Sequence, residues 1–229
     1  MSLNPKTNRY SRVTAIDEIG EAGQARICAG SVLMVGCGAL GSAVGLYLAG
    51  GGVSHIGICD FDTVAVSNLH RQVAYSQDQA GEPKALCLGE RMRALNDTVT
   101  VNAHAVRVTA DNFSELASGY DIVADCSDNA ATKHLISQLC HDAGKICVTG
   151  GVHGMTAQVF ITRPEGLSYS DFFGDGAAMA TPALFGVLGP VAGVAGTLQA
   201  TAIMQILAGL QPAYTLLTID TLTARVQRF

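Results

Sequence analysis

Short apolar runs alternate with helix-forming segments along the first two-thirds of the chain. The apolar runs are typical of buried parallel strands and cover residues 31–36, 55–60, 99–103, 120–125 and 145–149. The segments between them are expected to form helices over residues 39–50, 83–95, 111–118 and 129–143. This alternation predicts an α/β fold with a doubly wound, Rossmann-like and mostly parallel sheet.

The pattern changes on both sides of this core, which covers residues 30–151. Residues 8–25 are expected to form an N-terminal helical arm. Alternating polarity at 155–163 predicts an antiparallel strand, and residues 164–186 have the irregular composition of a crossover loop. A long helix and a hairpin are predicted at residues 190–209, 214–219 and 223–228. We therefore expect a single domain over residues 1–229, in which residues 190–229 add a C-terminal antiparallel extension.

The segment 187–210 is apolar enough to compare with a membrane span. It contains Pro190, Gln199, Gln205 and interior glycines, which a single bilayer-spanning helix tolerates poorly. We expect this segment to be a buried helix, either in the core or at a subunit interface.

Composition narrows the classes of protein that the chain can represent. With 229 residues and 48% hydrophobic residues, the chain can bury a large core. The formal net charge of −5 provides no basic surface for nucleic acid. Residues 1–10 are polar and lack the apolar stretch of a signal peptide, and the seven cysteines form no C-x-x-C pair. We expect a reduced, cytoplasmic protein that binds neither nucleic acid nor a membrane.

A glycine-rich turn joins the first strand to the first helix of the core. It reads Gly36-Cys37-Gly38-Ala39-Leu40-Gly41, a G-x-G-x-x-G motif. Gly36, Gly38 and Gly41 would let the backbone turn tightly and let a phosphate approach the N–H groups of the helix. Asp60 ends the next strand, about twenty residues beyond the turn, which is the usual place for a ribose ligand. The sequence therefore predicts a mononucleotide or dinucleotide site.

Polar and charged residues follow the second strand closely. Asp62, Asn68, Arg71 and Lys84 all lie within the next 24 positions after Asp60. A lone arginine or lysine in a loop is usually a solvated surface residue. Beside a nucleotide crevice, however, Arg71 and Lys84 could offset the charge that develops on leaving pyrophosphate. Asn68 could bind a phosphate or ribose oxygen, or it could cap the loop.

Asp128 lies where a later strand passes into a helix, in the sequence Asp125-Cys126-Ser127-Asp128-Asn129. It could simply cap that helix. Ligands of open α/β sheets, however, lie beyond the carboxyl ends of the strands. Asp128 would then face the same crevice as Asp60 and Asp62, and a phosphate-bound Mg²⁺ uses one or two such carboxylates. We favour a magnesium ligand.

These motifs belong to a longer series that occurs in one order along the chain. The series is Arg9-Tyr10-Ser11-Arg12, Gly36–Gly41, Asp60-Phe61-Asp62, Ser67-Asn68-Leu69-His70-Arg71-Gln72, Gly81-Glu82-Pro83-Lys84, Leu95-Asn96, Asp125-Cys126-Ser127-Asp128-Asn129, Gly189-Pro190-Val191-Ala192-Gly193 and Gly196-Thr197-Leu198-Gln199-Ala200. Together the motifs resemble the ThiF/MoeB/HesA family, the bacterial relatives of ubiquitin-activating enzymes. The resemblance runs from about Arg9 to the C-terminus.

The resemblance implies an adenylyltransferase. Such enzymes use MgATP to adenylate the C-terminal glycine carboxylate of a small ubiquitin-fold sulfur-carrier protein, and they release pyrophosphate. A sulfur donor then usually converts the acyl-adenylate to a thiocarboxylate. Thiamine thiazole and molybdopterin synthesis are the pathways implied, with ThiF the nearer match.

The resemblance also assigns roles to individual residues. Asp60 would hold the ribose, and Asp128 would bind magnesium. The phosphates would be contacted by Asn68, Arg71 and Lys84. Arg12, which alone would be taken as a surface arginine, would be an arginine finger that reaches into the other subunit's site of a twofold homodimer.

Three departures from the family pattern change what is expected. The family's first zinc-binding C-x-x-C pair should fall at Ser168-Tyr169-Ser170-Asp171, and the second pair should follow the last strand, where the sequence reaches Phe229. We therefore predict that zinc is absent. Many relatives carry a cysteine in the crossover loop, where this chain has Ala180-Thr181-Pro182-Ala183, so a covalent thiol step there is not expected. Lys133 stands where relatives often have arginine.

Other functions remain open at this point. The chain could adenylate a peptide or a small molecule in place of a carrier protein. The glycine turn and Asp60 also allow a NAD-binding oxidoreductase, in which Arg71, Lys84 and Asp128 would have no role. A non-catalytic interaction protein is a further alternative, which the intact cations argue against.

Overall fold

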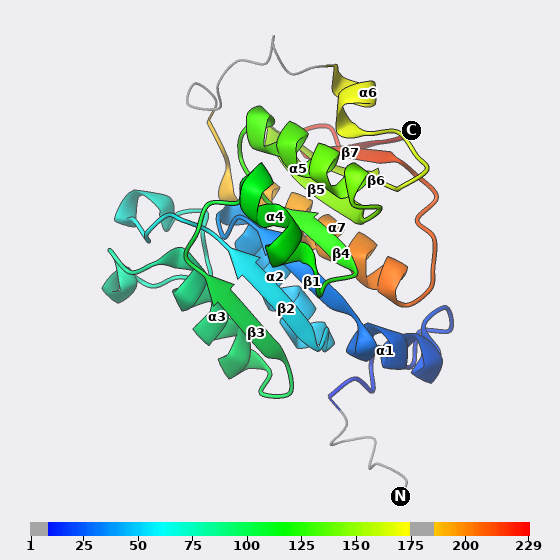
Figure 1. Ribbon diagram of the computed structural model, residues 1–229, viewed down its shortest axis with the longest axis horizontal. Helices are drawn as coiled ribbons and strands as arrows, with labels where there is room; N and C mark the ends of the chain where they lie inside the picture. Colours follow the sequence, from blue (N-terminus) through cyan, green and yellow to red (C-terminus); the bar gives the residue numbers. More distant parts are fainter. Residues whose placement is uncertain (1–8, 175–185) are drawn as a thin grey trace, which may run out of the picture.

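The computed structural model describes residues 9–174 and 186–229. In these residues one mixed sheet forms the centre of the fold, with the strand order β3-β2-β1-β4-β5-β6-β7-β8 (Figure 1). The strands are β1 (Ser31–Val35), β2 (His55–Cys59), β3 (Thr100–His104), β4 (Ile122–Asp125), β5 (Ile146–His153), β6 (Thr156–Thr162), β7 (Leu216–Asp220) and β8 (Arg225–Arg228). The first five strands pair in parallel, and the last three add antiparallel pairs. The predicted fold class is confirmed.

Helices cover both faces of the sheet. They are α1 (Gly20–Ala29), α2 (Ala39–Gly51), α3 (Lys84–Leu95), α4 (Ala110–Ala117), α5 (Ala130–Asp142), α6 (Tyr169–Phe173) and α7 (Gly189–Leu207). Two 3-10 turns, η1 (Val66–Asn68) and η2 (Gln77–Gln79), lie between β2 and α3. Helices α2, α3 and α7 pack on one face, whereas α4 and α5 pack on the other.

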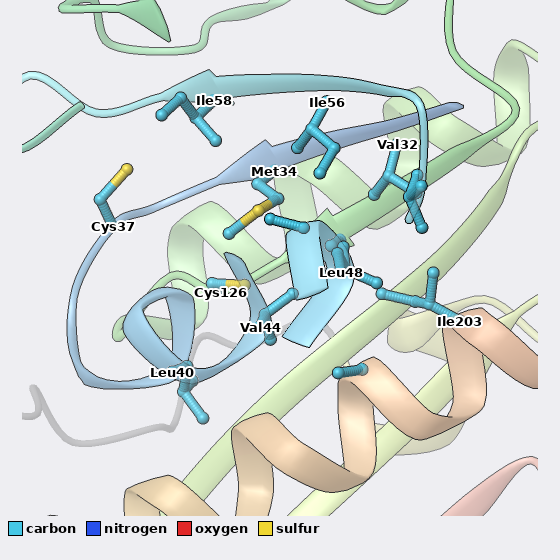
Figure 2. Close-up of a cluster of buried hydrophobic side chains, with 14 of the residues drawn as sticks. Val32, Met34, Cys37, Leu40, Val44, Leu48, Ile56, Ile58, Cys126 and Ile203 are labelled. Atoms are coloured by element: carbon cyan, nitrogen blue, oxygen red, sulfur yellow. The ribbon is translucent and has the colours of Figure 1, made fainter. Parts of the chain in front are cut away.

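Alternating side chains of each central strand supply the two cores. On β1, Val32 and Met34 point toward α2, and Leu33 points toward α4 and α5, with all three fully buried. Figure 2 shows the larger core, in which Leu48 of α2 and Ile203 of α7 meet the strands. Burial on both faces explains why these strands are continuous apolar runs in the sequence.

Helix α7 is the one helix in the described residues that is long and apolar enough to cross a membrane. It packs against α2, β5 and β6, and its Gln199 is fully buried and donates to the Asp125 carbonyl at the end of β4 and to the Val148 carbonyl within β5. Gly196 allows this packing, because a Cβ there would lie 2.8 Å from the Leu40 carbonyl oxygen of α2. One face of α7 therefore lies in the core, which is one of the two positions that the sequence allowed.

Two peripheral segments differ from the sequence prediction. Residues 9–19 form successive turns, and the helix of the N-terminal arm begins only at Gly20, which has a φ of +57° (Asn8 lies outside the described residues). Within the predicted crossover loop, α6 forms at Tyr169–Phe173 because Ser168 and Asp171 cap it reciprocally. Residues 175–185 of that loop lie outside the described residues.

Candidate nucleotide site

The glycine turn has the close backbone packing that its motif requires. Gly36 has a φ of +98°, and a Cβ there would lie 2.9 Å from the Cys126 carbonyl oxygen. A Cβ on Gly41 would lie only 2.2 Å from the Gly36 carbonyl oxygen. At Gly38, the residue before α2, the nearest atom to an added Cβ is the Gln72 side chain at 3.6 Å. The first and third glycines therefore shape the turn, and the second leaves space at the start of the helix.

Asp60 faces this turn from the end of β2. One carboxylate oxygen accepts a hydrogen bond from the Cys37 N–H at 2.6 Å, and the other accepts from the Asp62 N–H at 2.8 Å. Burial raises the pKa of the Asp60 carboxyl, and these two hydrogen bonds act against that rise. Each carboxylate oxygen has a second lone pair, so Asp60 can still accept from a ribose hydroxyl.

Lys84 is the first residue of α3, and this position brings its side chain to the same turn. Its ammonium lies 3.0 Å from the Asp62 carboxylate, and its side chain is buried, whereas that of Asp62 is 51% exposed. The buried Tyr75 connects this pair to the glycine turn, because its hydroxyl donates to the Cys37 carbonyl at 2.6 Å. Asp62 therefore holds Lys84 in place without a nucleotide, while the exposed carboxylate leaves the pair open to solvent.

Arg71 and Asn68 also lie together. The Arg71 guanidinium donates to the Asn68 side-chain oxygen at 3.0 Å and contacts Nε2 of His70 at 2.7 Å. The first residue of α7 packs tightly on this loop, because a Cβ on Gly189 would lie 2.7 Å from the His70 carbonyl oxygen. The half-buried guanidinium is thus oriented by side chains on its own loop and by α7 behind it.

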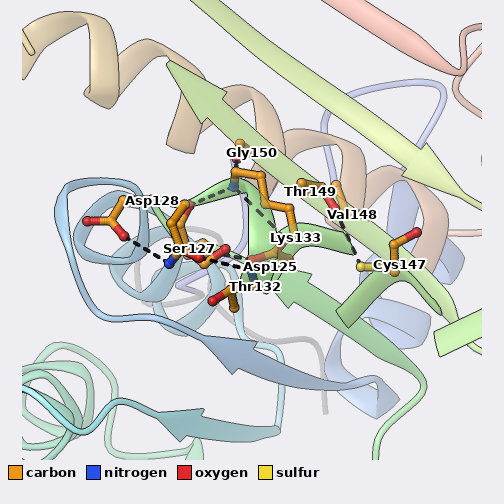
Figure 3. Close-up of polar contacts among 12 residues, drawn as sticks. Asp125, Ser127, Asp128, Thr132, Lys133, Cys147, Val148, Thr149 and Gly150 are labelled. Carbon is orange, nitrogen blue, oxygen red and sulfur yellow. Dashed lines mark hydrogen bonds and ion pairs between the residues drawn. The ribbon is translucent and has the colours of Figure 1, made fainter. Parts of the chain in front are cut away.

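Asp128 does not cap α5. The cap is the next residue, Asn129, whose side chain accepts from the Thr132 N–H at 2.9 Å. The Asp128 carboxylate is exposed, and its contact with the Asn129 amide is long, at 3.4 Å (Figure 3). The capping role that the sequence allowed for Asp128 is therefore filled by another residue, and the carboxylate is available to a ligand.

Strand register brings these groups to one edge of the sheet. Val35 of β1 pairs with Cys59 of β2 on one side and with Asp125 of β4 on the other. The glycine turn, Asp60 and Asp128 follow these three strand ends within a few residues, so they lie at the same carboxyl edge of the sheet, where ligands of open α/β sheets bind. This edge holds the carboxylates of Asp60, Asp62 and Asp128, the Lys84 ammonium and the N–H groups at the start of α2, which together suit a nucleotide with several phosphates and a bound cation.

Arg12 is not part of this arrangement in a single chain. The neighbouring Tyr10 hydroxyl accepts from the buried Asn96 amide at 3.0 Å, and Arg9 donates to the Leu95 carbonyl at the end of α3. Both anchors lie at the amino ends of the strands, opposite the crevice. Arg12 is exposed there, so it cannot reach the crevice of its own subunit in this conformation.

Ser168 and Asp171 stand where the family's first zinc-binding pair would fall, and in this chain they have a structural role. The Ser168 N–H and hydroxyl donate to the Asp171 carboxylate at 2.9 and 2.7 Å, and the Asp171 N–H donates back to the Ser168 oxygen at 3.1 Å. These residues therefore stabilise the first turn of α6. No group of three or more metal-ligating side chains occurs in residues 9–174 and 186–229, and the absence of zinc stays a prediction.

Tyr75 was not singled out by the sequence, and Gln72, Lys133 and Gln199 were named there without the contacts that they make in the structure. Tyr75 and Gln72 form the back of the glycine turn, and Lys133 and Gln199 hold the strand ends below Asp128. A polar residue within an apolar helix, such as Gln199, is the one sequence signal that could have pointed to this layer.

The fold and this candidate site are those of an α/β protein with a G-x-G-x-x-G turn at the carboxyl edge of its sheet. The model of the ThiF family matches residues 10–229, and the chain therefore belongs to the ThiF family. It is 36% identical over 228 residues to the adenylyltransferase and sulfurtransferase MOCS3 of Xenopus laevis, covering 97% of this chain and 51% of that protein. It is 37% identical over 212 residues to the sulfur carrier protein adenylyltransferase of Thermus thermophilus, covering 89% of this chain and 78% of that protein.

Solved structures confirm the fold. The chain superposes on E. coli MccB in complex with ATP with a TM-score of 0.85 at 19% identity, covering 100% of this chain and 71% of that one. The chain spans about half the length of the MOCS3 relatives that it matches.

Proposed function

We propose that this protein uses MgATP to adenylate the C-terminal carboxylate of a small ubiquitin-fold sulfur-carrier protein. The observation that supports the proposal is the strand register, which brings the glycine turn, Asp60 and the turn with Asp128 to the same edge of the sheet, together with the Lys84–Asp62 pair that follows Asp60. A relative named sulfur carrier protein adenylyltransferase and another named adenylyltransferase and sulfurtransferase support the choice of substrate.

In this proposal the residues of the candidate site contact different parts of the ATP molecule. Asp60 accepts hydrogen bonds from the ribose, and the N–H groups at the start of α2 face the phosphates. Arg71, Lys84 and Asn68 contact phosphate oxygens. Lys84 exchanges its present partner, the exposed Asp62 carboxylate, for a phosphate or is shared between the two. Asp62 therefore serves the nucleotide through Lys84.

The reaction is the attack of the carrier's carboxylate on the α-phosphate, with pyrophosphate as the leaving group. Negative charge develops on the phosphate oxygens and on the departing pyrophosphate, and Arg71 and Lys84 are preorganised to offset it. Asp128 is the residue that would hold Mg²⁺, and its exposed carboxylate next to the strand ends fits an ion that keeps water and phosphate ligands. Bound there, the ion would neutralise phosphate charge.

The thiols of this chain support a mechanism without a covalent thioester. Burial raises the pKa of Cys59 to about 12 and also raises the pKa of Cys37 and Cys126, so these thiols stay protonated at neutral pH. The sequence has no cysteine after Cys147. We propose that a sulfur donor acts on the acyl-adenylate, in thiamine or molybdopterin synthesis.

Two alternatives predict different substrates. Adenylation of a peptide or small-molecule carboxylate would use the same crevice without a carrier protein. A NAD-binding oxidoreductase would leave Arg71, Lys84 and Asp128 without a task.

The test is ATP–pyrophosphate exchange by the purified protein with candidate carriers encoded near its gene. Exchange should require a carrier with an intact C-terminal glycine and should be lost when that glycine is removed. Exchange with a free peptide alone would favour the second substrate class, and NADH binding without ATP binding would refute the proposal.

We further propose a twofold homodimer in the cytoplasm in which Arg12 serves the site of the other subunit. The position of Arg12 at the opposite edge of its own sheet supports this arrangement. Sedimentation that shows a fully active monomer at micromolar concentration would refute it.

A further inference from the structure

A buried ammonium lies directly below the turn that carries Asp128. Lys133, in the first turn of α5, is only 7% exposed. Its Nζ donates to the Ser127 carbonyl and to the Gly150 carbonyl, each at 2.6 Å, and it lies 4.0 Å from the Asp125 carboxylate (Figure 3). Lys133 thus links β5 to the turn after β4, because one of its two acceptors is the carbonyl of Ser127, the residue before Asp128.

The Asp125 carboxylate depends on this ammonium. Asp125 is fully buried, and its Oδ1 accepts from the Ser127 N–H at 2.9 Å. Its Oδ2 has no hydrogen-bond partner among the residues that the structure describes, and Lys133 is the cation beside it. A buried carboxylate needs a compensating charge. Lys133 therefore fixes Ser127 on both sides. It binds the Ser127 carbonyl directly, and it holds the Asp125 carboxylate that accepts from the Ser127 N–H.

Gln199 holds the same strand end from the opposite face. Its Nε2 donates to the Asp125 carbonyl at 2.9 Å and to the Val148 carbonyl at 2.8 Å. The Asp128 side chain, in contrast, has a single long contact, with Asn129. The direction of its carboxylate is therefore set by the backbone just before it, which Lys133 and Gln199 hold on its two sides.

We propose that Lys133 is a positioning residue for the metal and phosphate site: it orients the Ser127–Asp128 turn so that the Asp128 carboxylate meets the ion on the nucleotide. This inference rests on the proposed role of Asp128. Magnesium requires near-octahedral geometry with short bonds, so a small displacement of one carboxylate weakens the ion's binding. Partners behind metal ligands typically change metal affinity by about 10–100-fold when they are removed.

The experiment measures metal binding by the full chain in the presence of a non-hydrolysable ATP analogue, with Mn²⁺ as a paramagnetic probe. Lys133→Gln should weaken Mn²⁺ binding by about tenfold, while binding of the analogue without metal stays unchanged. Lys133→Arg, which keeps the charge and the donors, should bind Mn²⁺ with the affinity of the wild type. The midpoint of Mg²⁺ dependence in ATP–pyrophosphate exchange should shift in parallel.

The matched control is Lys145→Gln. The Lys145 ammonium also donates to a backbone carbonyl, that of Tyr120 at 2.7 Å, but at the opposite ends of β4 and β5. This variant should bind Mn²⁺ as the wild type does. Because Lys133→Gln leaves Asp125 uncompensated, the double variant Asp125→Asn/Lys133→Gln provides a neutral pair if the single variant does not fold.

The outcomes separate the inference from the proposed function. If folded Lys133→Gln, or the double variant, binds Mn²⁺ with wild-type affinity, Lys133 is a structural residue only and the inference is wrong. If the wild type shows no nucleotide-dependent Mn²⁺ binding, or Asp128→Asn leaves that binding unchanged, the metal role of Asp128 fails and the inference fails with it.

Discussion

Gly41 and Gly38 lie three residues apart in one turn, yet alanine at each position should affect different properties. In Gly41→Ala the new Cβ would lie 2.2 Å from the Gly36 carbonyl oxygen, whereas an unstrained contact needs roughly 3.5 Å. The new Cβ is attached directly to the backbone, and the atom that it meets is a backbone carbonyl oxygen. No side-chain rotation can therefore relieve the contact, and α2 must move away from β1. Overpacking of this kind costs about 1–3 kcal/mol, and we expect the upper end of that range. For a chain of this length, about 3 kcal/mol lowers Tm by roughly 6–12 °C.

Gly38→Ala should instead leave the fold almost intact. Gly38 has a φ of −75°, which alanine adopts, and the nearest atom to its Cβ is the Gln72 side chain at 3.6 Å. Replacing glycine at a helix N-cap with alanine costs less than about 1 kcal/mol. The methyl group, however, would occupy the space at the start of α2 where a phosphate is expected. We expect ATP affinity to fall by at least about tenfold, or 1.4 kcal/mol.

Thermal unfolding without nucleotide and calorimetric titration with MgATP measure the two effects separately. A Gly41→Ala protein with the Tm of the wild type would show that α2 does not approach β1 as closely as the structure indicates. Wild-type ATP affinity in Gly38→Ala would place the phosphates away from the start of α2.

Four further predictions concern the chemistry of the site and the thiols. Alanine at Asp128, Arg71 or Lys84 should lower ATP–pyrophosphate exchange by roughly two to three orders of magnitude, because each removes one preorganised charge, while circular dichroism shows a folded protein. Wild-type exchange in all three would refute the site. Arg12→Ala should be equally inactive alone, and mixing it with Asp128→Ala should restore activity, because a heterodimer contains one site with neither defect. No recovery, once subunit exchange is demonstrated, would remove Arg12 from the other subunit's site. Elemental analysis should find no stoichiometric zinc, and finding it would overturn that prediction. The pKa of Cys59 is raised from 9.0 to about 12, so its neutral form stabilises the fold fully below pH 9 and this contribution is lost as the pH rises toward 12. Unfolding titrations should show falling stability over that window, and Cys59→Ala should reduce the decline; an unchanged decline would exclude Cys59 as a contributor.

The central sheet and the crevice could be predicted from the sequence because their signals are local. A strand such as β1 is buried on both faces, so its residues are all apolar, and the glycine turn, Asp60 and Asp128 follow strand ends directly. Parallel pairing then brings those ends to one edge without further information. The same reasoning placed Lys84 near the crevice, although not in an ion pair with Asp62.

The remaining features depend on contacts that sequence spacing does not encode. The turns at residues 9–19 are anchored by Tyr10 on Asn96, which is 86 positions away. Helix α6 depends on a reciprocal cap in a segment without periodicity. The sequence names Lys133 and Gln199, but only the fold shows that Lys133 binds the Ser127 carbonyl and that Gln199 binds the Asp125 carbonyl at the end of β4.

The packing of α7 has a consequence for the order in which the protein can mature during synthesis. Its residues Gly189 and Gly196 press against the His70 and Leu40 carbonyls, so a helix made late supports the loop and the turn made early. The ribosome will have released the glycine turn, Asp60 and Lys84 long before α7 emerges. Until then the side of α2 that packs on α7 is uncovered, and the glycine turn and the His70 loop lack the support of α7. Nucleotide-binding competence should therefore arise late, when α7 folds back onto residues in the first third of the chain.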